Sequence, residues 1–165
     1  MPRLDELPAS SVVFIDANIF LGHFLSQSRS CTTFLERLWN REITGVTSVL
    51  ALSEVRHGLL RAEVSARHDL ASRRTVRYLR DHPAVIATLA DTRRSLEELR
   101  RWPLRVVHLT RGQFWQACRL SERFGLLTHD ALHLATLRAH RLCHLASADR
   151  DFLRARIPNL TVWRP

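Results

Sequence analysis

The segment Val12-Val13-Phe14-Ile15-Asp16-Ala17-Asn18 joins four consecutive apolar residues to an acid, a small residue and an amide. A short apolar run of this kind predicts a strand that is buried on both faces of a parallel sheet. Because the acid comes where the strand ends, we expect Asp16 at the carboxyl edge of that sheet, where open α/β folds bind their ligands. The rest of the chain offers further acidic side chains that can reach the same edge.

Short apolar runs recur along the chain and alternate with helix-forming stretches. After the strand at residues 11–16, strands are expected at residues 43–47, 105–109, 142–147 and 160–163, with helices in the intervals. Strands that are separated by helices imply right-handed crossovers and a parallel sheet with helices on both faces. The predicted fold is therefore α/β, a three-layer α/β/α domain that spans residues 1–165.

Two segments lie outside this alternation. Residues 1–10 are expected to be a disordered lead-in, and Asn18 is expected to cap the helix or turn after the first strand. Residues 61–105 are almost entirely helix-forming, are interrupted by Pro83, and carry eleven Arg against six acids. We expect them to form a helical arm that projects from the sheet. The basic residues of this arm are either a solvated face or a surface for a substrate or partner.

The chain is strongly basic, with a formal net charge of +9, and all 25 of its basic residues are Arg. An excess of this size favours a polyanionic partner. The planar guanidinium suits phosphate because it donates two hydrogen bonds at once. A solvated surface encoded by a genome of biased composition explains many of the same arginines. Charge alone therefore does not separate RNA, DNA and an acidic protein as partners.

Cysteine usage and hydropathy exclude several classes of protein. The chain has three Cys and no CxxC spacing, which argues against a disulfide framework and against a structural zinc site. The N-terminus carries early acids and lacks the apolar core of a signal peptide. No apolar run approaches the roughly 18 residues that a membrane span requires. We therefore expect a cytoplasmic protein without a membrane segment.

Several acidic residues fall where one edge of the predicted sheet can collect them. Asp16 and Asp149 each follow an apolar strand directly, so both face one crevice if the two strands are neighbours. Asp130 lies in the first turn of a helix whose apolar residues continue on the same face. Glu54 reaches in from the helix after the second strand. Asp151 follows Asp149 by two positions and can line the rim.

A cluster of carboxylates has a chemical consequence. Carboxylates that share a small space repel one another, and some take up a proton unless a cation compensates their charge. Ligand sets made only of oxygen favour Mg²⁺ or Mn²⁺ over zinc. Such a metal generates hydroxide from water and neutralises charge on a phosphate, which predicts an acidic nuclease site. An Asp at a strand end, taken alone, is more often a helix cap or a turn residue, Asp130 alone suits the positive end of its helix dipole, and Glu54 alone suits a surface position.

Four pieces of the chain resemble motifs of the PIN-domain family, and in particular of its VapC-type toxins. The pieces are Val13-Phe14-Ile15-Asp16-Ala17-Asn18, Thr47-Ser48-Val49 with Glu54 and Gly58, Leu127-Thr128-His129-Asp130-Ala131-Leu132-His133-Leu134-Ala135-Thr136, and Leu145-Ala146-Ser147-Ala148-Asp149-Arg150-Asp151-Phe152. They come in the family's order and within residues 12–163. The third and fourth pieces are fairly specific in combination.

The resemblance implies a fold, an activity and partners. It implies a five-stranded parallel sheet in the order 3-2-1-4-5 and a Mg²⁺- or Mn²⁺-dependent endoribonuclease that is the toxin of a toxin–antitoxin pair. The catalytic and metal-binding acids would be Asp16, Glu54, Asp130 and Asp149, with Asp151, Asn18 and Ser147 as additional site residues. The resemblance also implies a homodimer and a small cognate antitoxin protein that blocks the site.

The segment 61–105 is longer than in compact members of the family, which leaves the geometry of the dimer and of antitoxin docking open. Candidate RNA contacts are Arg73, Arg74 and Arg77 on this arm and Arg150 beside Asp149. Because the chain has no Lys, every basic contact to an RNA substrate would be made by Arg.

Two other functions fit part of the sequence. A non-catalytic PIN-like protein that binds nucleic acid or acts as a scaffold would keep the fold, but it would not need all four acids. An aspartyl-phosphate enzyme also places an Asp after its first strand, but it uses a second Asp two residues on and a Lys, whereas position 18 is Asn and no Lys exists. His133, one turn after Asp130, is either a packing residue or a group that acts beside the acids.

Overall fold

Five parallel strands form one sheet at the centre of the computed structural model, which describes residues 2–165. The strands are β1 (Val12–Ile15), β2 (Thr44–Ser48), β3 (Leu104–Val107), β4 (His144–Ala146) and β5 (Thr161–Trp163), and they lie in the order β3-β2-β1-β4-β5. In the register of the sheet, Phe14 lies opposite Val46 on one side and Leu145 on the other. The predicted α/β fold and the strand order 3-2-1-4-5 are confirmed.

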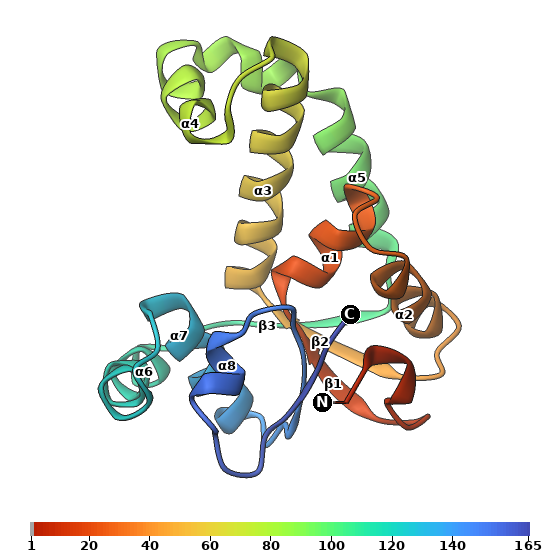
Figure 1. The fold of residues 1–165 in the computed structure, drawn as a ribbon, viewed down its shortest axis with the longest axis vertical. Helices are drawn as coiled ribbons and strands as arrows, with labels where there is room; N and C mark the ends of the chain where they lie inside the picture. The colour runs from red at the N-terminus through yellow and green to blue at the C-terminus, as the bar shows by residue number, and fades with distance from the viewer. Residues whose placement is uncertain (1) are drawn as a thin grey trace.

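Eight helices connect the strands in the described part of the chain (Figure 1). They are α1 (Ala17–Phe24), α2 (Arg29–Trp39), α3 (Val49–His68), α4 (Ser72–Asp81), α5 (Ala90–Arg101), α6 (Arg111–Phe124), α7 (Thr128–Ala139) and α8 (Asp151–Arg154). Short 3-10 turns lie at Leu4–Glu6 and Pro83–Thr88. Within residues 2–165, none of these helices combines the length and the apolar character that crossing a bilayer requires.

The central strand β1 is buried because helices cover both faces of the sheet. Successive side chains of a strand point to opposite faces. Val13 and Ile15 accordingly pack in one core with residues of α1, α2, α3 and α5, whereas Phe14 packs in a second core with residues of α6, α7 and α8. All three side chains have no exposed surface. This two-sided burial is the physical reason for the apolar run that precedes Asp16.

The expected helical arm extends from the sheet and is built around α3. With 20 residues, α3 is about 30 Å long. It runs away from the sheet, with α4 at its far end, and α5 returns towards the sheet beside it (Figure 1). A small apolar cluster that includes Leu60, Val64 and Leu89 packs within the arm. The buried carboxylate of Glu63 also accepts the backbone N–H groups of Asp91 and Thr92 at the start of α5. These contacts attach α5 to α3.

The N-terminal segment differs from the expectation of a disordered lead-in. Leu4 and Leu7 are 1% and 2% exposed and belong to the core that covers one face of the sheet. The guanidinium of Arg37 on α2 donates to the backbone carbonyls of both leucines, at 3.1 and 2.6 Å. Two apolar side chains spaced by one turn, with their carbonyls satisfied by Arg37, therefore hold this segment against the domain.

Candidate functional site

Asp16 stands at the junction of β1 and α1 and is 6% exposed. One of its carboxylate oxygens, Oδ1, accepts the backbone N–H of Ala17 at 2.7 Å and thereby caps α1. The expectation that Asn18 caps this helix is wrong, because the helix already begins at Ala17. Asp16 thus combines a structural role as a cap with a position at the carboxyl edge of the sheet.

The second oxygen of Asp16, Oδ2, is held by two side chains named in the sequence analysis. Ser147 donates its hydroxyl to Oδ2 at 2.6 Å, and Asn18 donates its amide N–H to the same atom. The amide oxygen of Asn18 accepts the backbone N–H of Ala148, while the Ser147 hydroxyl accepts that of Asp149 at 3.0 Å. These bonds fasten the loop after β4 to the end of β1, and they bring Asp149 towards Asp16.

The four predicted catalytic acids line one cleft of about 580 Å³ at this edge of the sheet. Its lining includes Asp16, Glu54, Asp130 and Asp149, together with Asn18, Leu21, Leu127 and two histidines. Asp130 comes from the first turn of α7, and Glu54 from the second turn of α3. Asp151 is not among the lining residues; its backbone N–H instead donates to the carboxylate of Asp149 at 2.8 Å.

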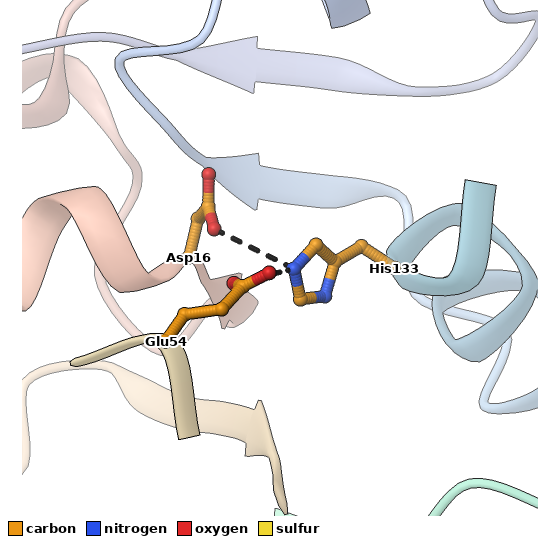
Figure 2. Close-up of side chains that lie close together, drawn as sticks. All are labelled: Asp16, Glu54 and His133. Carbon is orange, nitrogen blue, oxygen red and sulfur yellow. Dashed lines mark hydrogen bonds and ion pairs between the residues drawn. The ribbon is translucent and has the colours of Figure 1, made fainter. Parts of the chain in front are cut away.

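Two histidines of α7 contact the carboxylate of Glu54. His133 Nε2 lies 3.1 Å from Glu54 Oε2 and 3.8 Å from Asp16 Oδ1, as Figure 2 shows. His129 Nδ1 lies 2.7 Å from the other oxygen, Oε1 of Glu54. Asp16, Glu54 and His133 each offer one possible ligand atom, and these three atoms lie within 4.8 Å of one another. The acidic cleft therefore contains an imidazole whose Nε2 atom faces two of its carboxylates.

His129 is the site residue that the sequence analysis did not single out. It precedes Asp130 and lies four positions before His133, so the two histidines share a face of α7. This i, i+4 spacing on either side of Asp130 is the only sequence feature that points to His129. The sequence does not show that this face of α7 lies opposite Glu54.

Burial and mutual repulsion raise the pKa values of two acids of the cleft. Burial is the largest cause that raises the pKa of Asp16, and it outweighs the opposing effects of His133 and the Ser147 hydroxyl. The pKa of Asp130 rises to about 6, first through burial and then through the negative charge of Asp149. Both carboxyl groups therefore take up a proton more readily than a fully solvated aspartate does.

The Glu54–His133 pair shows the opposite behaviour. Burial acts to raise the pKa of Glu54, but the hydrogen bond from His133 and the charges of both histidines lower it below its usual value. Burial likewise acts to lower the pKa of His133, but the bond to Glu54 and the charges of Asp16 and Glu54 raise it. Each partner therefore stabilises the charged form of the other.

These observations fit a divalent cation in the cleft. The donors are predominantly carboxylate oxygens, which suit hard cations such as Mg²⁺ and Mn²⁺. After burial, the negative charges of neighbouring acids contribute to the raised pKa of Asp130, and a bound cation would offset that repulsion. Among the described residues, the ligand atoms close enough to share one ion come from Asp16, Glu54 and His133, and Asp130 and Asp149 line the same cleft.

The candidate RNA contacts lie in two different places. Arg150 is exposed and adjoins Asp149 at the cleft. Arg73, Arg74 and Arg77 are exposed on α4, which lies at the end of the arm remote from the sheet (Figure 1). Arg77 also pairs with Asp81 one turn later, at 3.7 Å. One of the four arginines is therefore next in sequence to an acid of the cleft, and the other three lie on α4, at the far end of the arm.

Comparison with known proteins identifies relatives of this chain. The family model of the PIN domain matches residues 13–158. Among curated proteins, the chain is 23% identical over 146 residues to Ribonuclease VapC2 of Methanocaldococcus jannaschii, a match that covers 86% of this chain and 87% of that protein. Residues 13–158, which the family model matches, contain all four acids of the cleft.

Solved structures share the fold. A chain of VapBC2 from Rickettsia felis, determined with a DNA fragment from its promoter, aligns with a TM-score of 0.60 and 17% identity over 93% of this chain and 98% of that one. VapC20 of Mycobacterium tuberculosis, described as a Sarcin-Ricin loop cleaving toxin, aligns with a TM-score of 0.59 and 18% identity over 90% and 98% of the two chains. The PIN domain model covers most of this chain, and the solved structures share its fold. This chain therefore belongs to the PIN domain family.

Proposed function

We propose that this protein is a metal-dependent endoribonuclease and the toxin of a toxin–antitoxin pair. The observation that carries the proposal is the convergence of Asp16, Glu54, Asp130 and Asp149, from four separate segments, on one cleft. The similarity to a ribonuclease of the VapC group supports RNA as the substrate. The net charge of +9 is consistent with a polyanionic substrate.

The residues of the cleft divide into those that hold a cation and those that orient them. Asp16, Asp130 and Asp149, with Glu54, would hold Mg²⁺ or Mn²⁺. A bound ion of this kind lowers the pKa of a water ligand and compensates negative charge that develops on a phosphate. Ser147 and Asn18 restrict the Asp16 carboxylate to one orientation through its Oδ2 atom.

Three further assignments belong to the proposal. Asp151 orients the loop that carries Asp149, through the bond from its backbone N–H. Arg150 meets the RNA backbone next to the cleft, and Arg73, Arg74 and Arg77 contact more distant phosphates. Residues 1–165 act as one nuclease domain, with the arm at residues 61–105 as part of it.

We also propose a small antitoxin protein and a second copy of the chain as partners. Solved structures of similar fold include the Rickettsia felis VapBC2 assembly and a toxin–antitoxin complex from Klebsiella pneumoniae, which aligns with a TM-score of 0.59 at 20% identity. An antitoxin that covers the cleft would have to place compensating charge among its carboxylates. The arm is one surface of this chain that such partners would meet.

The decisive experiment is cleavage of total cellular RNA by the purified protein with Mg²⁺, with Mn²⁺ and with EDTA. The parent is expected to cut RNA only with a metal, and Asp16→Ala is expected to abolish cutting. Asp5→Ala, at an exposed acid that does not line the cleft, is the matched control and should cut like the parent. Cleavage by Asp16→Ala at the parent's rate would refute the site.

The same experiment separates the nuclease from a non-catalytic nucleic-acid-binding or scaffold protein of the same fold. A folded parent that binds RNA without cutting it under any metal condition would favour the non-catalytic alternative. The presence of all four acids in one cleft favours the catalytic function, because a binding module has no use for clustered carboxylates facing a polyanion.

A further inference from the structure

His133 is a buried imidazole in the acidic cleft that the proposed mechanism does not use. Its side chain is 3% exposed, and it extends from α7 towards Asp16 and Glu54, with one ring nitrogen directed at both carboxylates (Figure 2). The ring packs on Phe14 of β1, with 5.6 Å between ring centroids and an interplanar angle of 55°. Contact with Phe14 on one side and with two carboxylates on the other restricts the orientation of the ring.

The contacts of the ring assign its hydrogen-bonding role. Nε2 faces two carboxylate oxygens, at 3.1 Å from Glu54 and 3.8 Å from Asp16. Carboxylates accept hydrogen bonds and do not donate them when ionised, so Nε2 carries the proton and donates it to Glu54. Nδ1 is fully buried and has no hydrogen-bond partner among the described residues.

The unpartnered Nδ1 argues against direct metal coordination by this residue. A histidine that ligates a metal almost always donates its other ring N–H to a carboxylate, a carbonyl or water. If Nε2 of His133 were a ligand, its proton would move to Nδ1, which faces no acceptor among residues 2–165. A buried N–H without a partner is costly. The donor role at Nε2 is therefore favoured.

His129 completes a clamp on Glu54. It contacts Oε1 at 2.7 Å, while His133 contacts Oε2 at 3.1 Å, so both oxygens of the carboxylate are engaged. Both histidines belong to α7, which also carries Asp130, whereas Glu54 belongs to α3. The clamp thus attaches Glu54 of α3 to the helix that carries Asp130, and it restricts the rotamers of the long Glu54 side chain.

We propose that His133 is a positioning residue: its Nε2–H holds Glu54 beside Asp16 and so sets the spacing of these carboxylates for a divalent cation. The inference rests on the proposed metal-dependent function and deepens it. Groups that orient metal-binding side chains typically change metal affinity or activity 10–100-fold when they are removed. An effect of about that size is expected for His133.

The first test compares His133→Leu, which removes the donor, with His133→Gln, whose side-chain amide can donate at a similar reach. Mn²⁺ affinity is measured by calorimetry, and kcat and KM on RNA are measured separately. His133→Leu is expected to weaken Mn²⁺ binding about 10–100-fold and to lower kcat with little change in KM. His133→Gln should recover most of both losses, and His140→Leu, at the exposed residue that follows the helix, should match the parent.

Equal Mn²⁺ affinity for the parent and folded His133→Leu would overturn the inference. If His133→Gln bound Mn²⁺ no more tightly than His133→Leu, the inference would be overturned as well, because a hydrogen-bond donor at this position would then not be enough. The metal readout is independent of catalysis. If the parent binds Mn²⁺ but cuts no RNA, a weaker affinity of His133→Leu still supports the positioning role, while the nuclease proposal fails.

A measurement on the unmodified protein covers the case in which His133→Leu does not fold. Pulsed electron paramagnetic resonance of the Mn²⁺-loaded parent reports nitrogen bound directly to the metal. The positioning role predicts no directly coordinated imidazole nitrogen in the spectrum. A strong coupling to such a nitrogen, lost in His133→Gln, would make His133 a ligand and overturn the inference.

Discussion

The hydroxyl of Ser147 donates a 2.6 Å hydrogen bond to Oδ2 of Asp16, although 131 positions separate the two residues in the chain. The bond exists because β1 and β4 are neighbours in the sheet and both end at the same edge. It joins the two loops that carry Asp16 and Asp149. The acidic cleft therefore depends on a polar network as much as on the acids themselves.

Loss of the Ser147 hydroxyl should weaken metal binding. Ser147→Ala leaves Oδ2 of the buried Asp16 with one donor fewer, which raises the pKa of Asp16 further above its usual range. A hydrogen bond to a charged group contributes about 1.5–3 kcal/mol, so we expect Mn²⁺ affinity at pH 7 to fall roughly 10–100-fold. Titration calorimetry checks this, with the exposed Ser53→Ala as control. An unchanged affinity would show that the bonds from Ala17 and Asn18 are enough to orient Asp16.

Metal binding should depend on pH through Asp130, whose pKa is raised to about 6. A protonated carboxyl binds a cation poorly, so Mn²⁺ affinity is expected to rise as the pH increases from 5 to 7.5. Asp130→Asn should weaken binding throughout and flatten this pH dependence. The measurement is a series of Mn²⁺ titrations at fixed ionic strength, and a steep increase near pH 6 that persists in Asp130→Asn would contradict the assignment.

The raised pKa of Asp130 also predicts that Asp130→Asn is more stable than the parent when no metal is bound. Because the folded pKa of Asp130 lies above the usual 3.8, this group stabilises the folded state below about pH 4, and the contribution is lost as the pH rises through 6. At pH 7, Asp130→Asn is therefore expected to be more stable than the parent by about 1 kcal/mol, allowing for screening of this partly exposed group. Urea unfolding in EDTA measures the difference. A less stable variant would contradict the repulsion argument.

The attachment of the arm should depend on the charge of Glu63. Burial acts to raise the pKa of Glu63, but the backbone N–H groups of Thr92 and Asp91 and the charge of Arg67 lower it below its usual 4.5. The stability that the ionised Glu63 adds to the folded state is therefore present above pH 4.5 and is lost as the pH falls below that value. Glu63→Gln is expected to reduce the free energy of unfolding at pH 7 by about 1–3 kcal/mol.

Denaturant unfolding of Glu63→Gln and of the exposed control Glu97→Gln measures this effect at pH 7 and at pH 4. The difference between parent and Glu63→Gln should shrink at pH 4, where the parent carboxylate begins to take up a proton. A difference that does not change with pH would mean that shape rather than charge determines the role of Glu63.

The arginines of α4 should contribute to RNA binding without contributing to chemistry. Replacing Arg73, Arg74 and Arg77 with Ala in an Asp16→Asn background is expected to weaken RNA binding. The slope of log Kd against log salt should fall by up to about 2, or about 0.7 for each phosphate contact to a single strand. In the active protein, kcat at saturating RNA should be unchanged, because α4 is remote from the cleft (Figure 1).

The matched control replaces the same three arginines with Lys, which keeps the charge and removes the planar fork. This variant should retain most of the binding and the salt dependence. Equal binding by the Ala, Lys and parent proteins would show that α4 is a solvated face.

The sequence by itself determined the elements of the sheet and the identity of the acids. An apolar run such as Val13-Phe14-Ile15 is a local property of the chain, and it reports burial on both faces wherever the strand is finally placed. Asp16 and Asp149 follow such runs directly, so their place at the edge of the sheet followed from the same pattern. The strand order came from the resemblance of whole motifs to a family, because periodicity does not encode which strands are neighbours.

Only the tertiary structure decided which side chains meet. The clamp of His129 and His133 on Glu54 joins residues of α7 and α3 that are 75 or more positions apart, and no local pattern relates them. The same is true of Arg37, which satisfies the carbonyls of Leu4 and Leu7 and orders a segment that looks unstructured in isolation. Local preferences select helices and strands, whereas distances of 3 Å between side chains depend on how those elements pack.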